Sequence, residues 1–508
     1  MLQRRADDTG LDGISSGNTA WVLASTALVF IMIPGLGYFY SGMVRSKNAV
    51  SLVLLCTMAM AVVAIQWAIW GYSLAFSHTA KSAVIGNLHN FMLLRLEETT
   101  HPNASTIPES LYMLFQGLFA ALTCALTVGA AAERMRIMPC VPYFFLWTTL
   151  VYCPIAYWTW SRRGFLSLLG VLDFAGGTPV EVCSGFSALA NSLVLGKRHG
   201  YGEEQFAPHN FLNILLGTAL LWFGWFGFNS GSVVAADGRA GIAMVTTHLA
   251  GSVAGVTWAL IAYFRFDRKL SSFHFCSGVV SGLVSITPAA GFVSPWAAMV
   301  FGVVSGVVCH FAVDLKEKLH FDDALDVFAV HGMGGVVGNL LTGIFADKEV
   351  ALLSGMTIKG GWMNRNWKQF PIQMASTAAG GLWAFGMTFI ILYLMNLVPF
   401  LRMRVPQEAE VTGLDLAEMG EAGYGYFGPH FHPKVTQVRS GTASFTLGDS
   451  NGGSTMGIDY LRRFQSDPPR EYSPSDSEKI HPNYPTKPPR VGTAPPPLGK
   501  DLDQSPEE

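Results

Sequence analysis

The stretch WVLASTALVFIMIPGLGYFYSGM, residues 21–43, contains no charged side chain. As an α-helix it would be about 34 Å long, enough to cross the hydrocarbon core of a bilayer. Similar apolar runs recur as far as residue 400. Charged residues make up 13% of the 508 residues, whereas soluble globular proteins carry about 25%. The sequence therefore predicts an all-α integral membrane protein that is surrounded by lipid.

Eleven apolar runs have the character of membrane-spanning helices. We expect these spans at residues 20–44, 49–76, 110–132, 138–159, 179–196, 208–231, 240–262, 273–290, 295–314, 327–346 and 370–400. An odd number of spans places the two termini on opposite sides of the membrane. Lys and Arg gather in the short loops that are cytoplasmic if the N-terminus is outside, although Arg162 and Arg163 run against this trend. We therefore expect an extracellular N-terminus and a cytoplasmic C-terminus.

Changes in composition divide the chain into four parts. Residues 1–18 are polar and form an extracellular N-terminal segment, and residues 19–401 form the transmembrane domain. Residues 402–427 are polar with a few apolar positions, which indicates a separate cytoplasmic region. Residues 428–508 are rich in Pro, Ser, Gly and charge, which is typical of a disordered tail. Within this tail, Pro485–Arg490 could dock an SH3-type groove, but a solvated Pro-rich segment is the more ordinary interpretation.

Several classes of function are disfavoured by composition and motif content. The formal net charge of -2 argues against nucleic-acid binding. The seven Cys lie in or beside apolar runs without C-x-x-C spacing, so we interpret them as small hydrophobic residues. Metal-ligand clusters, nucleophile motifs and phosphate loops are missing from the sequence, and we expect neither an enzyme nor a cofactor. Asn103-Ala104-Ser105 matches a glycosylation acceptor in a loop predicted to be outside.

The chain carries an internal repeat. Phe39-Tyr40-Ser41-Gly42 at the end of the first span matches Phe228-Asn229-Ser230-Gly231 at the end of the sixth. In the same order, an Asp precedes a titratable residue by eight positions at the start of the fifth and tenth spans, as Asp173–Glu181 and Asp323–His331. Five spans is an odd number, so the second copy would be inverted in the membrane. Inverted five-helix repeats are typical of transporters, whose pathway lies between the halves.

Ionisable residues inside spans are costly and mark a pathway by default. The repeat makes Glu181 and His331 partners, which could share a proton and line a pore. His248 and His310 have no counterpart, and we interpret them as structural. Asp173 precedes a Gly-Gly-Thr-Pro segment, so it could cap a helix or stabilise a nearby cation.

Aromatic side chains are common in the spans, and most of them belong to packing or to the interfacial belt. Trp160 ends the fourth span on the external side, where the face of an indole could attract a cation. Phe115 and Phe119 lie one helical turn apart on one face of the third span. Phe228 belongs to the repeated motif. The residue pattern alone assigns these four side chains to packing.

Four stretches resemble the signatures of the Amt/Mep/Rh ammonium transporters. The stretches are 39–48, FYSGMVRSKN; 172–180, LDFAGGTPV; 224–232, GWFGFNSGS; and 326–332, DVFAVHG. They occur in the family's order across about residues 18–430, and GLDLAE at 413–418 with YGY at 424–426 resembles the family's cytoplasmic C-terminal region. The resemblance implies a plasma-membrane permease for ammonium and methylammonium, eleven spans and a homotrimer with one pore in each subunit.

The resemblance also assigns roles to individual residues. It implies that Trp160, Phe119 and Ser232 recruit ammonium on the external side, and that Asp173 stabilises the bound cation indirectly. Phe119 and Phe228 would form a gate beneath this site. His331 matches the second of the family's twin histidines.

At the position of the first histidine the chain has Glu181, as in one group of fungal Mep permeases. This replacement puts the usual relay between two imidazoles in question. We expect deprotonation near the gate, passage of ammonia through the pore and a separate proton path through Glu181 and His331. A carboxylate could instead coordinate the cation directly.

Other functions remain as alternatives. The long tail would suit an ammonium sensor that signals to a cytoplasmic regulator or kinase, and Ser440 and Ser444 are candidate phosphosites by location. A passive ammonia or carbon dioxide channel of the Rh type would not need the cation site implied by Trp160 and Ser232.

Overall fold

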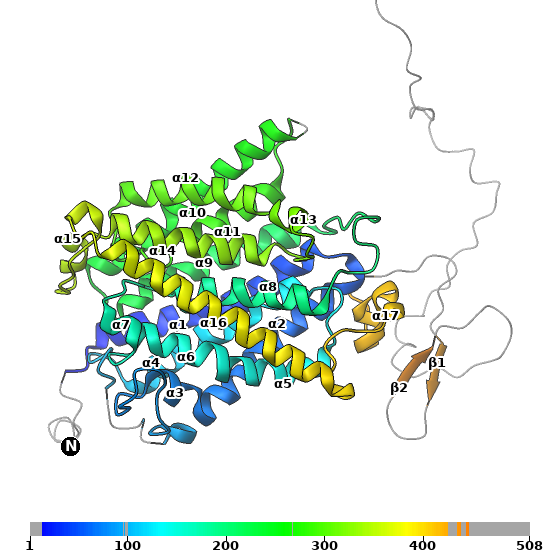
Figure 1. Cartoon of the computed structure of the whole chain (residues 1–508), viewed down its shortest axis with the longest axis horizontal. Coiled ribbons are helices and arrows are strands. Elements are labelled where there is room, and N and C mark those ends of the chain that lie inside the picture. The colour runs from blue at the N-terminus through cyan, green and yellow to red at the C-terminus, as the bar shows by residue number, and fades with distance from the viewer. Residues whose placement is uncertain are drawn as a thin grey trace, which may run out of the picture. The chain divides into compact units, whose positions relative to one another are not determined.

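The computed structural model describes residues 13–94, 96, 100–266, 268–424, 434–437 and 443–446. The chain folds as a bundle of helices (Figure 1). Its N-terminal half comprises α1 (Ser16–Met43), η1 (Ser46–Asn48), α2 (Ala49–Gln66), η2 (Trp67–Gly71), α3 (Tyr72–Phe76), η3 (Phe91–Leu93), α4 (Glu109–Leu126), η4 (Gly129–Ala131), α5 (Ile137–Trp147), η5 (Thr148–Tyr152), α6 (Cys153–Trp160), α7 (Phe165–Leu169), η6 (Gly177–Val182) and α8 (Cys183–Leu195).

The C-terminal half repeats the all-helical pattern. It comprises α9 (Phe211–Ser230), η7 (Gly231–Val233), α10 (Gly238–Arg265), α11 (Ser272–Ile286), α12 (Pro295–Ala312), α13 (Leu315–Lys318), η8 (Phe328–Gly332), α14 (Met333–Phe345), α15 (Lys348–Leu352), η9 (Trp362–Asn364), α16 (Gln369–Leu397), η10 (Pro399–Leu401), α17 (Gln407–Thr412) and η11 (Asp415–Met419). Two short strands, β1 (Lys434–Gln437) and β2 (Ala443–Thr446), pair with each other.

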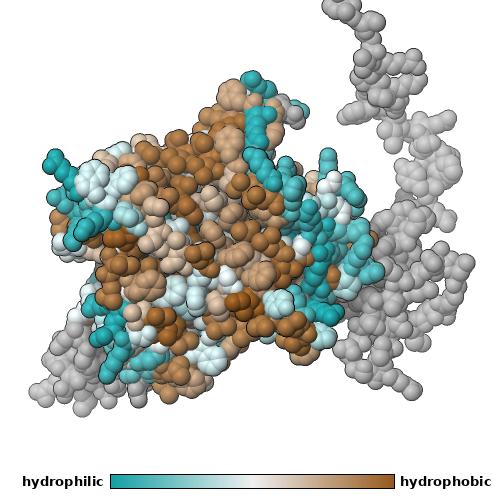
Figure 2. All heavy atoms as spheres, viewed as in Figure 1, coloured by the Kyte–Doolittle hydropathy of each residue, from teal (hydrophilic) through white to brown (hydrophobic). Residues whose placement is uncertain are grey.

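Nine helical segments in the described part of the chain are long and apolar enough to cross a membrane. Figure 2 shows apolar side chains over the middle of the bundle and hydrophilic side chains at its two ends. Helices satisfy their own backbone hydrogen bonds, which the interior of a bilayer requires. The predicted all-α membrane fold is therefore confirmed.

The prediction of eleven spans is met in part. The fifth and eighth predicted spans correspond to the continuous helix η6–α8 and to α11, and these two are not among the nine long apolar helices. α11 has 15 residues and is buried along most of its length, so protein rather than lipid surrounds it. Apolar length is a weaker signal for helices packed inside a bundle than for helices that face lipid.

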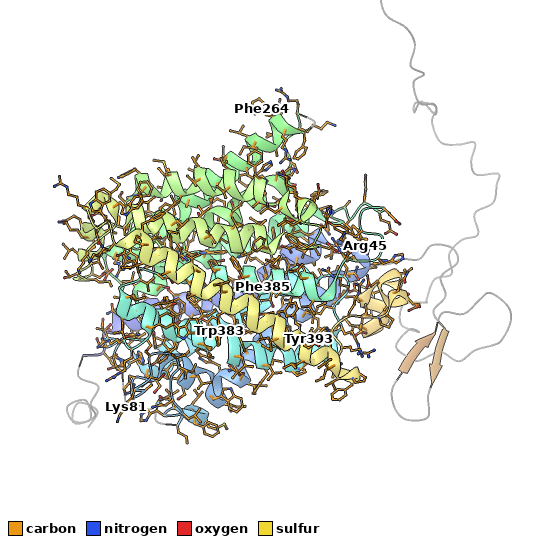
Figure 3. The ribbon with its side chains drawn as sticks, in the orientation of Figure 1. Arg45, Lys81, Phe264, Trp383, Phe385 and Tyr393 are labelled. Carbon is orange, nitrogen blue, oxygen red and sulfur yellow. The ribbon has the colours of Figure 1, made fainter. Side chains whose placement is uncertain are left out.

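Matching elements of the two sequence halves lie together in the bundle. α1 packs along α9, and η6 contacts α14 while η8 contacts α8. α16 packs against both α8 and α14 and crosses the outside of the bundle. Figure 3 shows Trp383, Phe385 and Tyr393 along α16, with Lys81 at the end where α1 begins and Arg45 at the end where α17 lies. We call these ends the α1 end and the α17 end.

A network of buried ions joins the loops at the α17 end. Arg198 contacts Glu133 at 3.2 Å and Asp322 at 2.9 Å. Arg45 reaches Glu133 at 3.0 Å, and Arg134 reaches Asp322 at 3.7 Å. Burial alone would raise the pKa of Asp322, but the hydrogen bonds and charge of Arg198, with the charge of Arg134, hold this pKa below its usual range. The Asp322 carboxylate therefore stays ionised, and the network ties four loops together.

The segment after α16 folds back onto the same end. The Asp415 carboxylate accepts hydrogen bonds from the backbone N–H groups of Val50 and Ser51, at 3.1 and 2.8 Å. These groups belong to the first turn of α2, whose N–H groups lack partners within the helix. The N–H of Leu414 donates to the Asn48 side chain at 2.8 Å. The C-terminal region is thus attached to α2 by a helix cap supplied from more than 350 residues away.

The predicted tail, residues 428–508, is described at β1 and β2 alone. These two strands pair with each other, and the disorder expected for residues 428–508 stays a prediction. Ser444 falls in β2. Ser440, the Pro485–Arg490 motif and the first twelve residues lie outside the described residues.

The ion network predicts a large stability effect at Arg198. Arg198→Met leaves Glu133 and Asp322 buried with one cation fewer. We expect the free energy of unfolding to fall by about 3 kcal/mol, because the remaining carboxylates stay buried without a compensating charge. Lys348→Met is the matched control, because Lys348 pairs with Glu349 at an exposed site. Thermal unfolding of the detergent-solubilised protein measures both. Equal melting temperatures for the two variants would contradict the structural role of the network.

Candidate functional site

A cavity of about 380 Å³ opens at the α1 end of the bundle. We call it the vestibule. Its wall includes four residues that the sequence singled out for cation binding: Phe119, Trp160, Asp173 and Ser232. They come from α4, α6, the turn before η6, and η7, so four segments that are distant in sequence converge there.

Trp160 is fixed at the edge of the vestibule by contacts on its ring. The indole Nε1 donates to the backbone carbonyl of Asp173 at 3.1 Å. Phe76 stacks on the ring with centroids 6.3 Å apart and planes 15° apart, and Phe119 meets it edge-on at 6.2 Å. The half-buried indole therefore presents its electron-rich face in a water-accessible hollow, which suits a cation.

Ser232 supplies an oxygen to the same vestibule. Its hydroxyl donates to the carbonyl of Phe228 at 2.8 Å, one turn earlier in the chain. Because the hydrogen is used in this bond, the lone pairs of the oxygen remain to accept a hydrogen bond from a ligand. The vestibule thus combines aromatic faces with a hydroxyl acceptor.

Two phenylalanine rings close the bottom of the vestibule. Phe119 and Phe228 stack with centroids 4.0 Å apart and planes 15° apart, and both rings are almost fully buried. Phe115 packs on Phe119 at 4.9 Å and supports it from behind. Rings in van der Waals contact leave no space for a hydrated ion, so the stack, which we call the gate, closes the bottom of the vestibule.

Beyond the gate lies a narrow lumen of about 10 Å³. Its lining is apolar apart from Glu181, His331 and Trp225, whose indole Nε1 donates to Thr287 at 3.0 Å. A cavity of this size holds about one water at most. His331 also lines a further cavity of about 70 Å³ toward the α17 end, together with Phe39 and Tyr40.

Glu181 and His331 meet in this lumen. The Nδ1 of His331 and the Oε2 of Glu181 are 2.7 Å apart, and both side chains are buried. The other carboxylate oxygen, Oε1, is buried and has no hydrogen-bond partner among the described atoms. The pair can therefore share a proton through one oxygen and offer the second oxygen to a passing molecule.

Unusual backbone places these two side chains. Glu181 lies in η6 and His331 in η8, and both segments are π-helical turns that continue directly into the α-helices α8 and α14. π-Helical turns are rare and occur often at functional sites, because the wider turn redirects side chains. The predicted pairing of the two residues across the repeat is matched by this geometry.

The close packing of two backbones brings the pair together. A Cβ atom added to Gly185 would lie 2.1 Å from the backbone N of Gly332. No side chain fits in that space, so α8 and η8 touch through their main chains. The contact lies one turn after Glu181 and one residue after His331, which fixes their separation.

Asp173 stabilises the start of η6. Its Oδ1 accepts from the N–H groups of Gly176 and Gly177 at 2.9 and 2.7 Å, and its Oδ2 accepts from Thr178 at 2.7 Å. Gly176 has a φ of 117°, a left-handed conformation that glycine adopts without strain. The carboxylate therefore caps the helix. Asp173 also lines the vestibule, where its charge would attract a cation without direct contact.

The remaining sequence candidates lie elsewhere. His248 contacts Trp222 with ring centroids 5.4 Å apart and planes tilted by 31°, on the outside of the bundle. Nη1 of Arg265 donates to Nε2 of His310 at 3.2 Å near the α17 end. Asn103, the predicted glycosylation acceptor, borders the vestibule, and its Nδ2 donates to the carbonyl of Trp160 at 3.0 Å.

Sequence reasoning missed several residues that line the path. Phe39 and Trp225 line the lumen, and Gln116 and Arg239 line the vestibule. The repeat contained a signal for Phe39, because it is the counterpart of Phe228 in the matching FYSG and FNSG motifs. Gln116 and Arg239 carried no comparable signal, since a single polar residue in an apolar run does not reveal which cavity it faces.

The arrangement is a path rather than a reaction centre. It leads from a cation-friendly vestibule through an aromatic gate to a nearly dry lumen with one carboxylate–imidazole pair. Within the described residues, no cluster of three or more His, Cys, Asp or Glu side chains could hold a metal ion. Such a path can select a small cation, strip its water and move a proton.

Comparisons with known proteins agree on the nature of the chain. A model of the Ammonium Transporter Family matches residues 20–424. Ammonium transporter 1 of Schizosaccharomyces pombe is 49% identical over 414 residues, which cover 81% of this chain and 83% of that protein. Ammonium transporter MEP2 of Saccharomyces cerevisiae is 45% identical, with 80% and 83% covered. The crystal structure of Candida albicans Mep2 superposes with a TM-score of 0.75 at 46% identity, covering 78% of this chain and 88% of that one.

The backbone contact beside the pair predicts a steric effect. Gly185→Ala places a methyl group against Gly332, and we expect a loss of stability of about 1–3 kcal/mol from overpacking. Gly241→Ala is the matched control, because a Cβ there meets nothing within 4 Å and alanine favours a helix. Thermal unfolding in detergent compares the two variants. Unchanged stability of Gly185→Ala would mean that the two backbones can separate without cost.

Proposed function

The chain belongs to the ammonium transporter family and carries ammonium across a membrane, and we propose that it does so by recruiting the cation, deprotonating it and relaying the proton separately. It is a transporter and not an enzyme. The observation that carries the proposal is the hydrogen-bonded pair of Glu181 and His331 in a narrow lumen behind a closed aromatic gate.

Recruitment takes place in the vestibule. Ammonium is strongly hydrated, and entering an apolar region as an ion costs it heavily. The ring faces of Trp160 and Phe119 and the oxygen of Ser232 replace part of this hydration. Asp173 adds a negative charge to the vestibule while its oxygens stay bound to backbone N–H groups.

The gate separates hydrated from dehydrated species. The stack of Phe119 on Phe228 opens by ring rotation, and the lumen beyond has space for about one water-sized molecule. Neutral ammonia fits such a lumen at a far lower cost than the ion. Ammonium therefore gives up one proton near the gate, and ammonia passes Phe39 and Trp225 toward the opposite end.

The proton follows the carboxylate–imidazole pair. Glu181 accepts it on Oε1, which has no hydrogen-bond partner among the described residues, and the 2.7 Å contact of Oε2 with His331 passes a proton onward. His331 borders both the lumen and the cavity at the α17 end, so it can release the proton there. Ammonia is protonated again in that cavity. Direct coordination of the intact cation by Glu181 is the competing mechanism.

The arrangement in the membrane is part of the same proposal. We place the α1 end outside and the α17 end in the cytoplasm of a plasma membrane, because the basic loops gather at the α17 end. Counting η6–α8 and α11 with the nine long helices gives eleven spans, arranged as two inverted five-helix repeats and a final helix, α16. A homotrimer with one pore in each subunit is supported by the resemblance to the family.

A regulatory role is proposed for the C-terminal region, residues 402–427. Its contacts with α2 through Asp415 and Leu414 couple it to the loop that follows α1, and α1 supplies Phe39 and Tyr40 to the path. A cytoplasmic regulator or kinase would act on the tail beyond this region. A sensor that carries little flux is not favoured, because relatives that are 49% and 45% identical to this chain are named ammonium transporters.

Loss of His331 should abolish charge movement. In cells or oocytes expressing the chain, we expect an ammonium-dependent inward current that saturates and disappears in His331→Ala, because the proton then has no relay. His248→Ala is the matched control, since this ring lies outside the bundle. Both variants must reach the surface in equal amounts. Uptake of labelled methylammonium without any current in the wild type would rule out separate proton transfer with net charge.

Replacing Glu181 should change the pH dependence. In Glu181→His we expect the pH optimum of transport to move upward by about one unit or more, because free imidazole and carboxyl groups differ by about two pKa units. Ion selectivity should tighten, since a neutral imidazole offers a cation less than a carboxylate does. Glu181→Gln keeps the shape and removes the titration. Identical pH profiles and ion selectivity in the wild type, Glu181→His and Glu181→Gln would contradict the proposed role of Glu181.

A further inference from the structure

The loop between α3 and α4 carries a turn that is anchored to the bundle. The N–H of Ala104 donates to the carbonyl of His101 at 2.8 Å, which closes the turn. The ring of His101 stacks on Tyr112 with centroids 4.8 Å apart and planes 16° apart. Its Nε2 lies 2.9 Å from the carbonyl of Phe76. His101 and Ala104 are both buried, so this part of the loop is anchored to the bundle.

Asn103 projects from this turn toward the vestibule. Its backbone N–H donates to Nδ1 of His101 at 3.1 Å, which leaves Nε2–H of the ring as the donor to Phe76. Burial lowers the pKa of His101 and keeps the ring neutral, as this pattern requires. The side-chain Nδ2 of Asn103 donates to the carbonyl of Trp160 at 3.0 Å.

The other end of the amide is also occupied. Nε of Arg162 donates to Oδ1 of Asn103 at 3.3 Å, and the same guanidinium donates to the carbonyl of Pro102. These bonds determine which way the amide faces, because its oxygen meets a donor and its nitrogen meets an acceptor. Asn103 is therefore oriented from both sides.

The hydrogen bond from Asn103 satisfies a backbone carbonyl at the end of α6. Trp160 is the last residue of α6, and carbonyls in the last turn of a helix have no partner within the helix. Asn103 supplies that partner from a different segment. The indole of Trp160 is held at a second point by the carbonyl of Asp173. The indole of Trp160 thus keeps its position because hydrogen bonds hold both the backbone carbonyl of the residue and the Nε1 of its ring.

We infer that Asn103 is a positioning residue that holds Trp160 in the ammonium recruitment site, and that it is not a glycan acceptor. The inference rests on the proposed role of Trp160 in recruiting the cation. Asn103 itself does not need to touch the substrate. It acts by holding the indole face toward the vestibule.

The glycosylation motif would instead place a sugar on Nδ2 of Asn103, the same atom that donates to Trp160. Asn103-Ala104-Ser105 is the one N-x-S/T triplet in the 508-residue sequence. A glycan is joined to Nδ2, the atom that donates to Trp160, and would have to occupy the space between the turn and the helix end. Asn103 also borders both the vestibule and a neighbouring cavity of about 210 Å³, so its amide forms a wall between them.

Two substitutions separate the two roles. Asn103→Ala and Ser105→Ala both destroy the glycosylation motif, but Asn103→Ala alone removes the amide that holds Trp160. Ser105 is exposed and lines neither cavity. We expect Asn103→Ala to raise the KM of methylammonium uptake about five-fold, as for the loss of one hydrogen bond, with Vmax changed less than about two-fold. Ser105→Ala should leave both values unchanged.

Two further measurements make the test decisive. In a Trp160→Leu background, Asn103→Ala should add nothing, because the ring that it positions is gone. Peptide-N-glycosidase should not change the mobility of the wild-type protein. Equal effects of Asn103→Ala and Ser105→Ala, with a mobility shift on deglycosylation, would overturn the inference in favour of a glycan.

The same experiment keeps the two proposals apart. If Trp160→Leu raises KM and Asn103→Ala does not, the positioning role fails while recruitment by Trp160 stands. If Trp160→Leu leaves KM unchanged, recruitment by Trp160 fails first.

Discussion

Glu181 and His331 are 150 residues apart in the sequence, and their hydrogen bond exists because the main chains of α8 and η8 touch where Gly185 meets Gly332. With larger residues there, the two helices would separate and the carboxylate and imidazole would each be left unpartnered in an apolar lumen. An isolated charge in such surroundings is far more costly than a paired one. The pore can therefore contain a titratable pair because its backbones can approach so closely, and the gate and vestibule lie above this contact.

The second requirement is that broken helices inside a membrane must satisfy their backbone by other means. Asp173 does this for the start of η6 by accepting three N–H groups. Asn339 links the same segment to α16, since its Nδ2 donates to Thr178 and to Thr377 at 2.9 and 3.0 Å. These polar side chains allow a π-helical turn to exist in a buried position, and the turn directs Glu181 into the lumen. The same hydrogen bonds thus satisfy the backbone of η6 and place Glu181.

Some of this could be predicted from the sequence. Apolar runs and low charge established the membrane fold, and the spacing shared by Asp173–Glu181 and Asp323–His331 identified the central pair before any coordinates. The roles proposed for Trp160 and Phe228 came from family resemblance, because the sequence pattern of an aromatic residue in an apolar helix is the same in a gate as in the core. Phe39, Trp225 and Asn103 were assigned no role on the path, since their positions depend on how segments pack. Helix counting was least secure for α11, whose burial removes the need for a long lipid-facing stretch.

A carboxylate at position 181 in place of an imidazole changes which group donates and which accepts hydrogen bonds in the lumen. In a pair of imidazoles, each ring has one donor and one acceptor nitrogen when neutral, so the tautomers decide what ammonia meets. A carboxylate bound to His331 through one oxygen presents its second oxygen as an acceptor when ionised and as a donor when protonated there. The charge of the pair then decides whether the lumen favours an N–H group or a lone pair. In the proposed mechanism, a proton that arrives on Glu181 alters the site that the next ammonia encounters, and this couples the proton path to the ammonia path although the two paths use different atoms.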